Sequence, residues 1–79
     1  MKLPRDLSGS NLVRCLCRHW GYAVVNQEGS HVQLEMLTPS KHRVTVPAHG
    51  ALKVGTLADI LRVVARHKGG SREDVLNSL

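Results

Sequence analysis

The chain has 79 residues, which is enough for a single domain over residues 1–79 and too few for an enzyme with a deep, closed cavity. Apolar residues make up 42% of it, which favours a packed core, and the lack of Phe beside one Trp and one Tyr argues against an aromatic platform for stacked bases. Eleven Lys and Arg against six Asp and Glu give a net charge of +5, which favours a nucleic acid as partner over an acidic protein or a membrane surface, although solubility alone would also account for it.

A first amphipathic helix is predicted from about Gly9 to Trp20, with Ser8 as its N-cap. Apolar residues recur at helical spacing along one side: Leu12, Val13, Leu16, Cys17 and Trp20. Polar and basic residues occupy the other side: Asn11, Arg14, Arg18 and His19. Cys15 and Cys17 lie about 200° apart around the helix axis, so they neither pair nor chelate a metal together. We therefore expect reduced thiols and a cytoplasmic protein.

Three strands are predicted next, and their connections are too short for crossovers, so the sheet should be an antiparallel meander. The first strand covers 22–27, the second covers 31–37 and the third ends at Pro47, with turns at 28–30 and 38–40. The alternation places five side chains toward the core: Val32, Leu34, Met36, Val44 and Val46. It places five others on the opposite face: His31, Gln33, Glu35, Arg43 and Thr45.

A second helix is predicted after the connection 48–55, with Thr56 as its N-cap and Asp59 at the capping-box position. Its core stripe consists of Leu57, Ile60, Leu61 and Val64. The glycines at 69–70 end it, and residues from 71 onward can form a short terminal helix that frays. The predicted fold class is α+β, in the order α-β-β-β-α with a short C-terminal helix. Two helices would cover one face of the sheet and leave the other face open.

His31 is the residue with the clearest chemical potential, because the alternation puts its imidazole on the open face together with the Arg43 guanidinium. In RNA cleavage the substrate supplies its own nucleophile, the 2′-OH. The protein then needs one group that removes that proton, and cations that stabilise the phosphorane charge. A free imidazole has a pKa of about 6.5, which suits proton transfer near neutrality. Gly29 lets a backbone come close, and Ser30 or backbone N–H groups can hold a phosphate oxygen.

Taken on residue types alone, an ordinary surface histidine at the start of a strand is the favoured interpretation of His31. Among the other histidines, His42 falls on the core-facing parity and is expected to be half-buried. His19 and His67 lie at helix ends, where an imidazolium meets the helix dipole favourably. His49, in the loop before the second helix, is a candidate substrate contact.

Other basic residues offer weaker candidates for phosphate binding. Lys53 precedes the second helix, whose N-terminal N–H groups can accept a phosphate, although a capped helix with a solvated lysine fits equally well. Arg62, Arg66 and Lys68 form a short basic stripe, typical of a solvated face but also suited to an RNA backbone or an acidic partner. No cluster has metal-ligand spacing, so no metal and no cofactor is expected. No apolar run approaches the roughly 18–20 residues of a membrane span.

Three short blocks of sequence occur together in a characteristic order. They are Lys2-Leu3-Pro4-Arg5-Asp6-Leu7-Ser8-Gly9, Gln27-Glu28-Gly29-Ser30-His31, and Lys53-Val54-Gly55-Thr56-Leu57 followed by Ile60-Leu61. In these blocks, in its size and in its basic charge, essentially the whole chain resembles the HicA-like mRNA interferase toxins, also called the YcfA-like family. The loop at 49–52 departs from the lysine-rich stretch that many members carry there.

The resemblance implies a fold like that of double-stranded-RNA-binding domains, which agrees with the predicted α-β-β-β-α order. It also implies a ribosome-independent, metal-free endoribonuclease that cleaves mRNA and arrests growth. A HicB-type antitoxin encoded next to the toxin would neutralise it by covering the active site. The family's catalytic histidine corresponds to His31 and its glycine to Gly29, which makes catalysis the favoured interpretation of His31.

The sequence therefore predicts the toxin of a type II toxin–antitoxin pair, a cytoplasmic endoribonuclease that acts on mRNA as single-stranded RNA and binds a HicB-like antitoxin but no membrane. His31 is expected to act as the general base toward the 2′-OH, and the general acid is left open between His49 and water. The expected substrate-binding residues are Gly29, Ser30, Arg43 and Lys53. Two alternatives are a non-catalytic double-stranded-RNA-binding module, with its basic cluster along the second helix, and an adaptor whose open sheet face binds an acidic protein.

Overall fold

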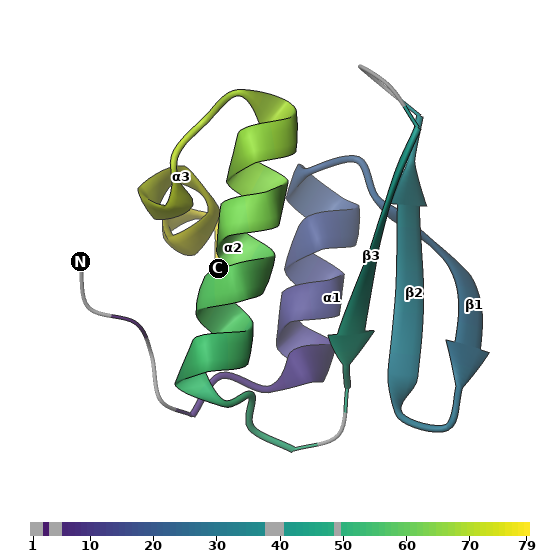
Figure 1. Ribbon diagram of the computed structural model, residues 1–79. Coiled ribbons are helices and arrows are strands. Elements are labelled where there is room, and N and C mark those ends of the chain that lie inside the picture. The colour runs from purple at the N-terminus through teal and green to yellow at the C-terminus, as the bar shows by residue number, and fades with distance from the viewer. Residues whose placement is uncertain (1–2, 4–5, 38–40, 49) are drawn as a thin grey trace.

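The structure is a computed structural model that describes residues 3, 6–37, 41–48 and 50–79. Its elements are α1 (Gly9–His19), β1 (Ala23–Glu28), β2 (His31–Met36), β3 (His42–Pro47), α2 (Val54–Lys68) and α3 (Arg72–Asn77) (Figure 1). This order confirms the predicted α+β class with a short C-terminal helix. The turn predicted at 38–40 lies outside the described residues. Within the described ranges, no helix is long and apolar enough to cross a membrane.

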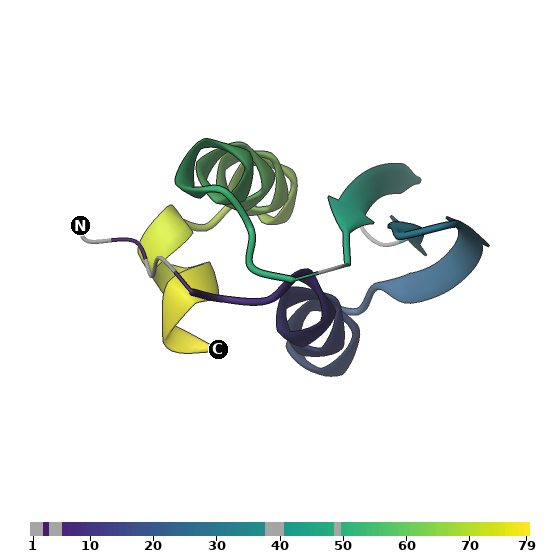
Figure 2. The ribbon, with the colours of Figure 1, turned by 90° about the horizontal axis from the view of Figure 1, so that it is seen from below.

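The sheet is the predicted antiparallel meander, in the order β1-β2-β3. Helices α1 and α2 both lie on one side of it and leave the other face open, as the view along the strands shows (Figure 2). Both helices pack against β3. Strand β1, at the far edge, is therefore exposed along its whole length, and it shows no two-residue alternation of burial.

The core joins one face of the sheet to the inner sides of the helices. All five strand side chains predicted to point inward are buried, which confirms the predicted alternation in β2 and β3. The largest fully buried side chains come from every layer: Leu12, Leu16, Leu34, Leu57, Leu61, Val46, Val64 and Val75. Aliphatic packing of this kind suits a chain without Phe, because branched side chains interdigitate closely in a thin core.

The helix ends confirm one predicted cap and correct another. Ser8 caps α1 as predicted, and its side chain accepts a hydrogen bond from the Asn11 N–H. Thr56 does not cap α2: the helix begins at Val54 after Lys53, which makes no side-chain cap. The N–H of Leu52 donates to the Leu7 carbonyl (2.8 Å), and this long-range bond fixes the chain just before the helix, so α2 starts earlier than a local cap signal suggests.

Helix α3 is packed onto the domain, which corrects the expectation that it frays. Ser71 and Asp74 form a capping box at its start, and Val75 is fully buried. The indole N–H of Trp20 donates to the Ser78 hydroxyl (2.8 Å). The α3 segment therefore closes the core on the side of α1, where Cys15 is also buried. Both cysteines are free thiols, as expected.

Candidate functional site

The turn before His31 is a two-residue β-hairpin loop formed by Gly29 and Ser30, and it pairs Glu28 with His31. Gly29 has a φ of 58°, and in the described part of the chain only glycines have a positive φ. A glycine with positive φ at the first loop position is typical of a type II′ turn, whose twist matches that of the flanking strands. The turn therefore fixes the place of His31 at the beginning of β2.

His31 lies on the open face of the sheet and is exposed. Its neighbour in the strand, Val32, is buried in the core, so the two side chains point to opposite faces. On the side of β2 that faces β3, His31 pairs with Pro47. The prediction that the His31 imidazole stands clear of the core is confirmed.

The hairpin turn is attached to the start of α1 through the chain that follows β3. The Ala48 N–H donates to the Ser30 carbonyl (2.6 Å), and the Ser10 hydroxyl donates to the Ala48 carbonyl (2.9 Å). Gly9 is buried beside this segment, where an added Cβ would lie 1.9 Å from the Pro47 carbonyl oxygen. The N-terminus of α1 and the segment 47–48 thus hold the turn in place.

Arg43 shares the open face with His31 but lies far from it along the strands. The register pairs Arg43 with Glu35, four residues from His31, which corresponds to about 13 Å in a strand. The prediction of an imidazole beside the guanidinium is therefore wrong. The parity of a strand fixes the face of a side chain, whereas its position along the neighbouring strand depends on the register.

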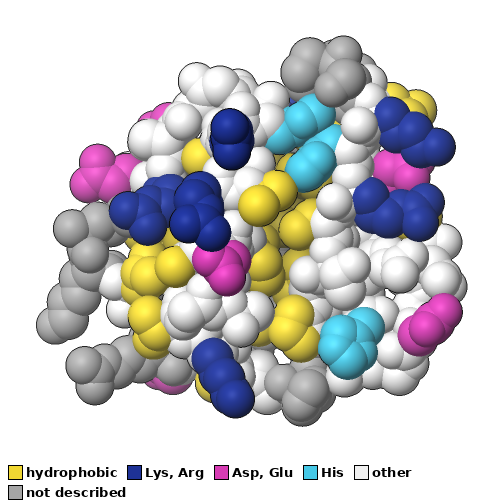
Figure 3. All heavy atoms as spheres, viewed as in Figure 1, with side chains coloured by type: hydrophobic (Ala, Val, Ile, Leu, Met, Phe, Trp, Pro, Cys, Tyr) yellow, Lys and Arg dark blue, Asp and Glu magenta, His cyan; other side chains and the backbone are white. Residues whose placement is uncertain are grey.

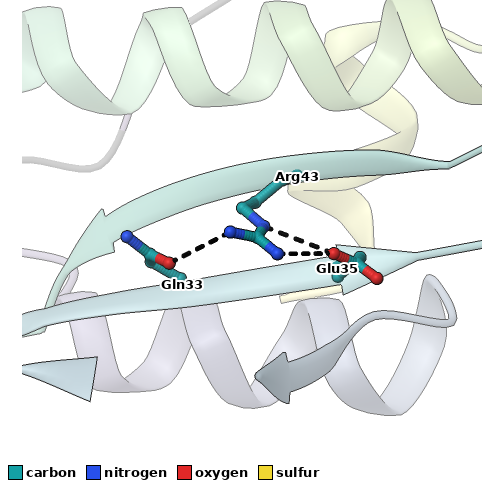
Figure 4. A network of polar contacts seen from close by, with 3 residues as sticks. All are labelled: Gln33, Glu35 and Arg43. Atoms are coloured by element: carbon teal, nitrogen blue, oxygen red, sulfur yellow. Dashed lines mark hydrogen bonds and ion pairs between the residues drawn. The ribbon is translucent and has the colours of Figure 1, made fainter. Parts of the chain in front are cut away.

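The Arg43 guanidinium is instead held by two side chains of β2 (Figure 4). Its Nη2 and Nε donate to Glu35 Oε2 at 2.8 and 3.3 Å, and its Nη1 donates to Gln33 Oε1 at 3.4 Å. The hydrogen bond from Arg43 lowers the pKa of Glu35, which stays ionised as a partner. Arg43 is thus engaged by a carboxylate, with which a phosphate at this end of the sheet would have to compete.

Lys53 lies at the end of the molecule where both longer helices begin and where β2 starts (Figure 1). It is exposed and its side chain caps nothing, so its ammonium is accessible to an anion at that end. His49, the sequence-based candidate for a substrate contact, lies outside the described residues. The shared end thus brings the turn at 29–30, His31 and the N-terminus of α2 to one side of the domain.

A second group of rings lies at the opposite end of β2 and includes two histidines. The His42 and His67 rings stack with centroids 4.2 Å apart, and Tyr22 approaches His42 edge-on at 6.0 Å. Histidine side chains are accordingly visible near both ends of the molecule in Figure 3. His42 is half-buried, as expected. The stacking of His67, expected only to meet the helix dipole, could not be predicted because the two residues come from distant segments.

The environment of this ring cluster disfavours the charged forms of His42 and Tyr22. Burial, followed by the nearby His67, lowers the pKa of His42, and burial raises the pKa of Tyr22 to about 12. The Tyr22 hydroxyl and both Nε2 atoms are buried without a hydrogen-bond partner in the described structure. We conclude that the cluster packs β3 against α2, and that it contributes nothing directly to the surface around His31.

The surface around His31 combines an accessible imidazole with a tight glycine turn. Such an arrangement can accept a proton from a substrate bound across the open face and can hold an anion near the turn. Within residues 3, 6–37, 41–48 and 50–79, no three His, Cys, Asp or Glu side chains are grouped so that they could hold a metal ion.

Comparison with known proteins identifies one protein family. A family model described as "HicA toxin of bacterial toxin-antitoxin" matches residues 9–65. The match covers more than two thirds of the chain, from the first residue of α1 into the last turns of α2, and it includes the hairpin turn and His31. No curated protein and no solved structure matches the chain.

Proposed function

Because the chain belongs to the HicA toxin family of bacterial toxin–antitoxin systems, we propose that it acts as an endoribonuclease on mRNA, with His31 as its general base. The single observation that carries this proposal is the exposed His31 imidazole on the open sheet face, set immediately after a tight glycine turn. Family membership makes the protein a toxin, and the geometry around His31 supports this particular chemistry.

The proposed reaction needs no nucleophile from the protein. A nitrogen of His31 takes the proton of the ribose 2′-OH, and the 2′-oxygen attacks the adjacent phosphorus. A bond from the 2′-oxygen to phosphorus forms while the bond from phosphorus to the 5′-oxygen breaks. The 5′-oxygen leaves with a proton from water or from His49. The products are then a 2′,3′-cyclic phosphate and a free 5′-hydroxyl.

Charge develops on the phosphate oxygens during this reaction, and the proposal assigns their stabilisation to groups near the turn. The backbone N–H groups at Gly29 and the Ser30 hydroxyl are suitable donors, and Lys53 supplies the positive charge. Arg43, considered for this role from the sequence, is engaged by Glu35. We assign it to the sheet surface beyond the scissile phosphate and not to the reaction.

The proposed partner is a HicB-like antitoxin, and the proposed compartment is the cytoplasm. An antitoxin that covers the open sheet face would block access to His31, because the imidazole projects from that face. The net charge of +5 would favour an acidic covering surface. In this proposal RNA and antitoxin compete for the same face.

The test is a digestion of single-stranded RNA in the presence of EDTA, with wild type and His31→Ala in parallel. We expect wild type to produce fragments that end in a 2′,3′-cyclic phosphate, detected by mass spectrometry. His31→Ala should lose about 10²–10⁴-fold in rate and keep its circular dichroism spectrum, because the side chain is exposed. Glu73→Ala, which removes an exposed side chain of α3, is the control and should cut normally.

Two results would contradict the proposal. Undiminished cutting by folded His31→Ala would remove the histidine from the reaction. Binding of RNA by wild type without any fragments would favour the alternative of a non-catalytic RNA-binding module.

A further inference from the structure

One face of α1 carries basic side chains that the proposed active site does not use. Ser10, Asn11, Arg14 and Arg18 are all exposed, and their helical positions span only about 100° of the α1 surface. We call these four residues the α1 basic face. Arg14 and Arg18 lie one turn apart, a rise of about 6 Å, which is comparable to the spacing of adjacent phosphates in a nucleic acid strand.

The α1 basic face borders a hollow of about 240 Å³. Asn11, Arg14 and Arg18 line one side of it, with Cys15 and His19, and Ser78 lines the other. Leu7 and Leu79 also line the hollow, so its lining combines apolar side chains with the donors of Asn11, Arg14 and Arg18. The hollow is large enough for a phosphodiester group, and it is open to solvent along the helix.

The two arginines of this face have no carboxylate partner. All six Asp and Glu residues of the chain fall within the described residues, and none forms an ion pair with Arg14 or Arg18. Arg43 and Arg62, by contrast, are neutralised by Glu35 and Asp59 at 2.8 and 2.7 Å. Arg14 and Arg18 are thus available to an external anion, as are Arg66 and Lys68 of α2, whereas Arg62 of α2 is already paired.

The α1 basic face begins next to the hairpin turn. Ser10 is its first residue, and its hydroxyl donates to the Ala48 carbonyl, while the Ala48 N–H donates to Ser30. Only two hydrogen bonds therefore separate the face from the residue that precedes His31. The start of the α1 basic face and the hairpin turn therefore lie close together at the same end of the domain.

We propose that the α1 basic face binds the RNA backbone on one side of the cleaved bond, with Arg14 and Arg18 each contacting a phosphate. This inference rests on the proposed function, since RNA is the substrate of that same site. It adds a second region of contact that positions the strand across His31. The contacts are to phosphates, so they bind RNA of any sequence.

RNA is favoured over an acidic protein as the occupant because none of the four exposed residues of the α1 basic face is hydrophobic. Protein interfaces usually have an apolar or aromatic centre with a polar rim. Most of the exposed large hydrophobic residues lie on other parts of the molecule: Val24, Val25, Leu37, Val54 and Val63. Leu79, which lines the hollow together with Leu7, is the exception.

The test measures RNA binding in a His31→Ala background, so that the probe is not cut. A fluorescein-labelled single-stranded RNA of about 16 nucleotides is titrated at several salt concentrations, and binding is followed by fluorescence anisotropy. We expect Arg14→Gln/Arg18→Gln to weaken binding about tenfold at low salt. It should also reduce the slope of log K against log salt by about 1.4, or 0.7 for each lost phosphate contact.

The matched control is Arg62→Gln/Arg66→Gln, which removes the same charge from α2. We expect it to change the slope much less, and equal effects of the two double variants would overturn the proposal in favour of a general charge effect. Arg14→Lys/Arg18→Lys should keep the salt slope, because lysine retains a point charge for a phosphate. If Arg14→Lys/Arg18→Lys lowered the salt slope as much as Arg14→Gln/Arg18→Gln does, the result would contradict contacts between these side chains and phosphates.

Two further measurements separate this inference from its premise. Unchanged RNA binding together with weakened antitoxin binding by Arg14→Gln/Arg18→Gln would overturn the assignment to RNA. Cleavage by wild type is scored separately, so a protein that binds RNA through α1 but does not cut would refute the proposed function and leave this inference intact.

Discussion

Arg43 and Glu35 face each other across β3 and β2, with the Arg43 Nη2 atom 2.8 Å from Glu35 Oε2. His31 lies at the other end of β2, opposite Pro47. The open face of the sheet is thus divided into a charge-paired end and an end with an accessible imidazole. A phosphate near His31 must find its positive charge elsewhere, and the proposal assigns that role to Lys53, which is exposed just before α2.

This division predicts that Arg43→Gln changes RNA cleavage little, by less than about threefold. Removing a group that stabilises a transition state usually costs about 10²–10³ in rate, and Arg43 is engaged with Glu35 instead. The measurement is the initial rate of digestion of a labelled RNA under the EDTA conditions described above. A loss near a hundredfold in a folded protein would return Arg43 to the active site.

Gly9 is predicted to tolerate no side chain. Gly9→Ala would place a Cβ 1.9 Å from the Pro47 carbonyl oxygen and 2.7 Å from Ala48 Cα. Both contacts are to backbone, so α1 must shift and the free energy of unfolding should fall by about 1–3 kcal/mol or more. Because the shifted segment also holds the hairpin turn, cleavage should fall as well.

The control for this prediction is Gly55→Ala in the first turn of α2, where an added Cβ meets no atom within 4 Å. It should raise the free energy of unfolding by about 0.5 kcal/mol, since alanine is the better helix former. Urea denaturation of both variants provides the comparison. Equal stability of Gly9→Ala and wild type would show that the α1 contact is loose.

Gly29 is predicted to combine a conformational and a functional role. Gly29→Ala puts a Cβ at a φ of 58°, which should lower the free energy of unfolding by about 1–2 kcal/mol. The same change at Gly69, which ends α2 with a φ of 73°, should cost a similar amount. Only Gly29→Ala should also reduce cleavage, by about tenfold or more, because small displacements of a catalytic group are costly.

The comparison is made at a temperature where both glycine variants are folded, as judged by circular dichroism. If both variants cut at the same rate, the turn would serve stability alone and Gly29 would have no part in positioning His31.

His42 is predicted to make the fold sensitive to acid. Its pKa is lowered from the ordinary value of 6.5, so the folded state disfavours the imidazolium. The stability contributed by the neutral ring is therefore fully present above pH 6.5 and is lost as the pH falls through the lowered pKa. Thermal melts of wild type should show a falling midpoint as the pH drops from about 7 to about 5.

His42→Phe keeps a ring against His67 but removes the titrating group, and its midpoint should fall less over the same range. His19→Gln, at an exposed position, should retain the wild-type fall. A fall in His42→Phe as large as in wild type would place the acid sensitivity elsewhere.

Much of the fold follows from local pattern. The element order, the cap at Ser8 and the outward position of His31 were all predicted from periodicity and from the residue types at turns. These features depend on neighbours a few residues away, because a side chain in a strand or helix is buried or exposed according to its phase. The resemblance added the role of His31, which the residue pattern alone did not favour.

The tertiary structure determined which residues of different segments lie next to each other. It paired Arg43 with Glu35 and not with His31, began α2 at Val54, stacked His67 on His42 and placed Ser10 of α1 beside the hairpin turn. Each of these relationships joins residues from different segments, through strand register, long-range hydrogen bonds or the packing of separate elements. The sequence by itself determined which side chains face solvent, and only the folded chain determined which of them meet, because proximity between distant segments depends on contacts that no local window contains.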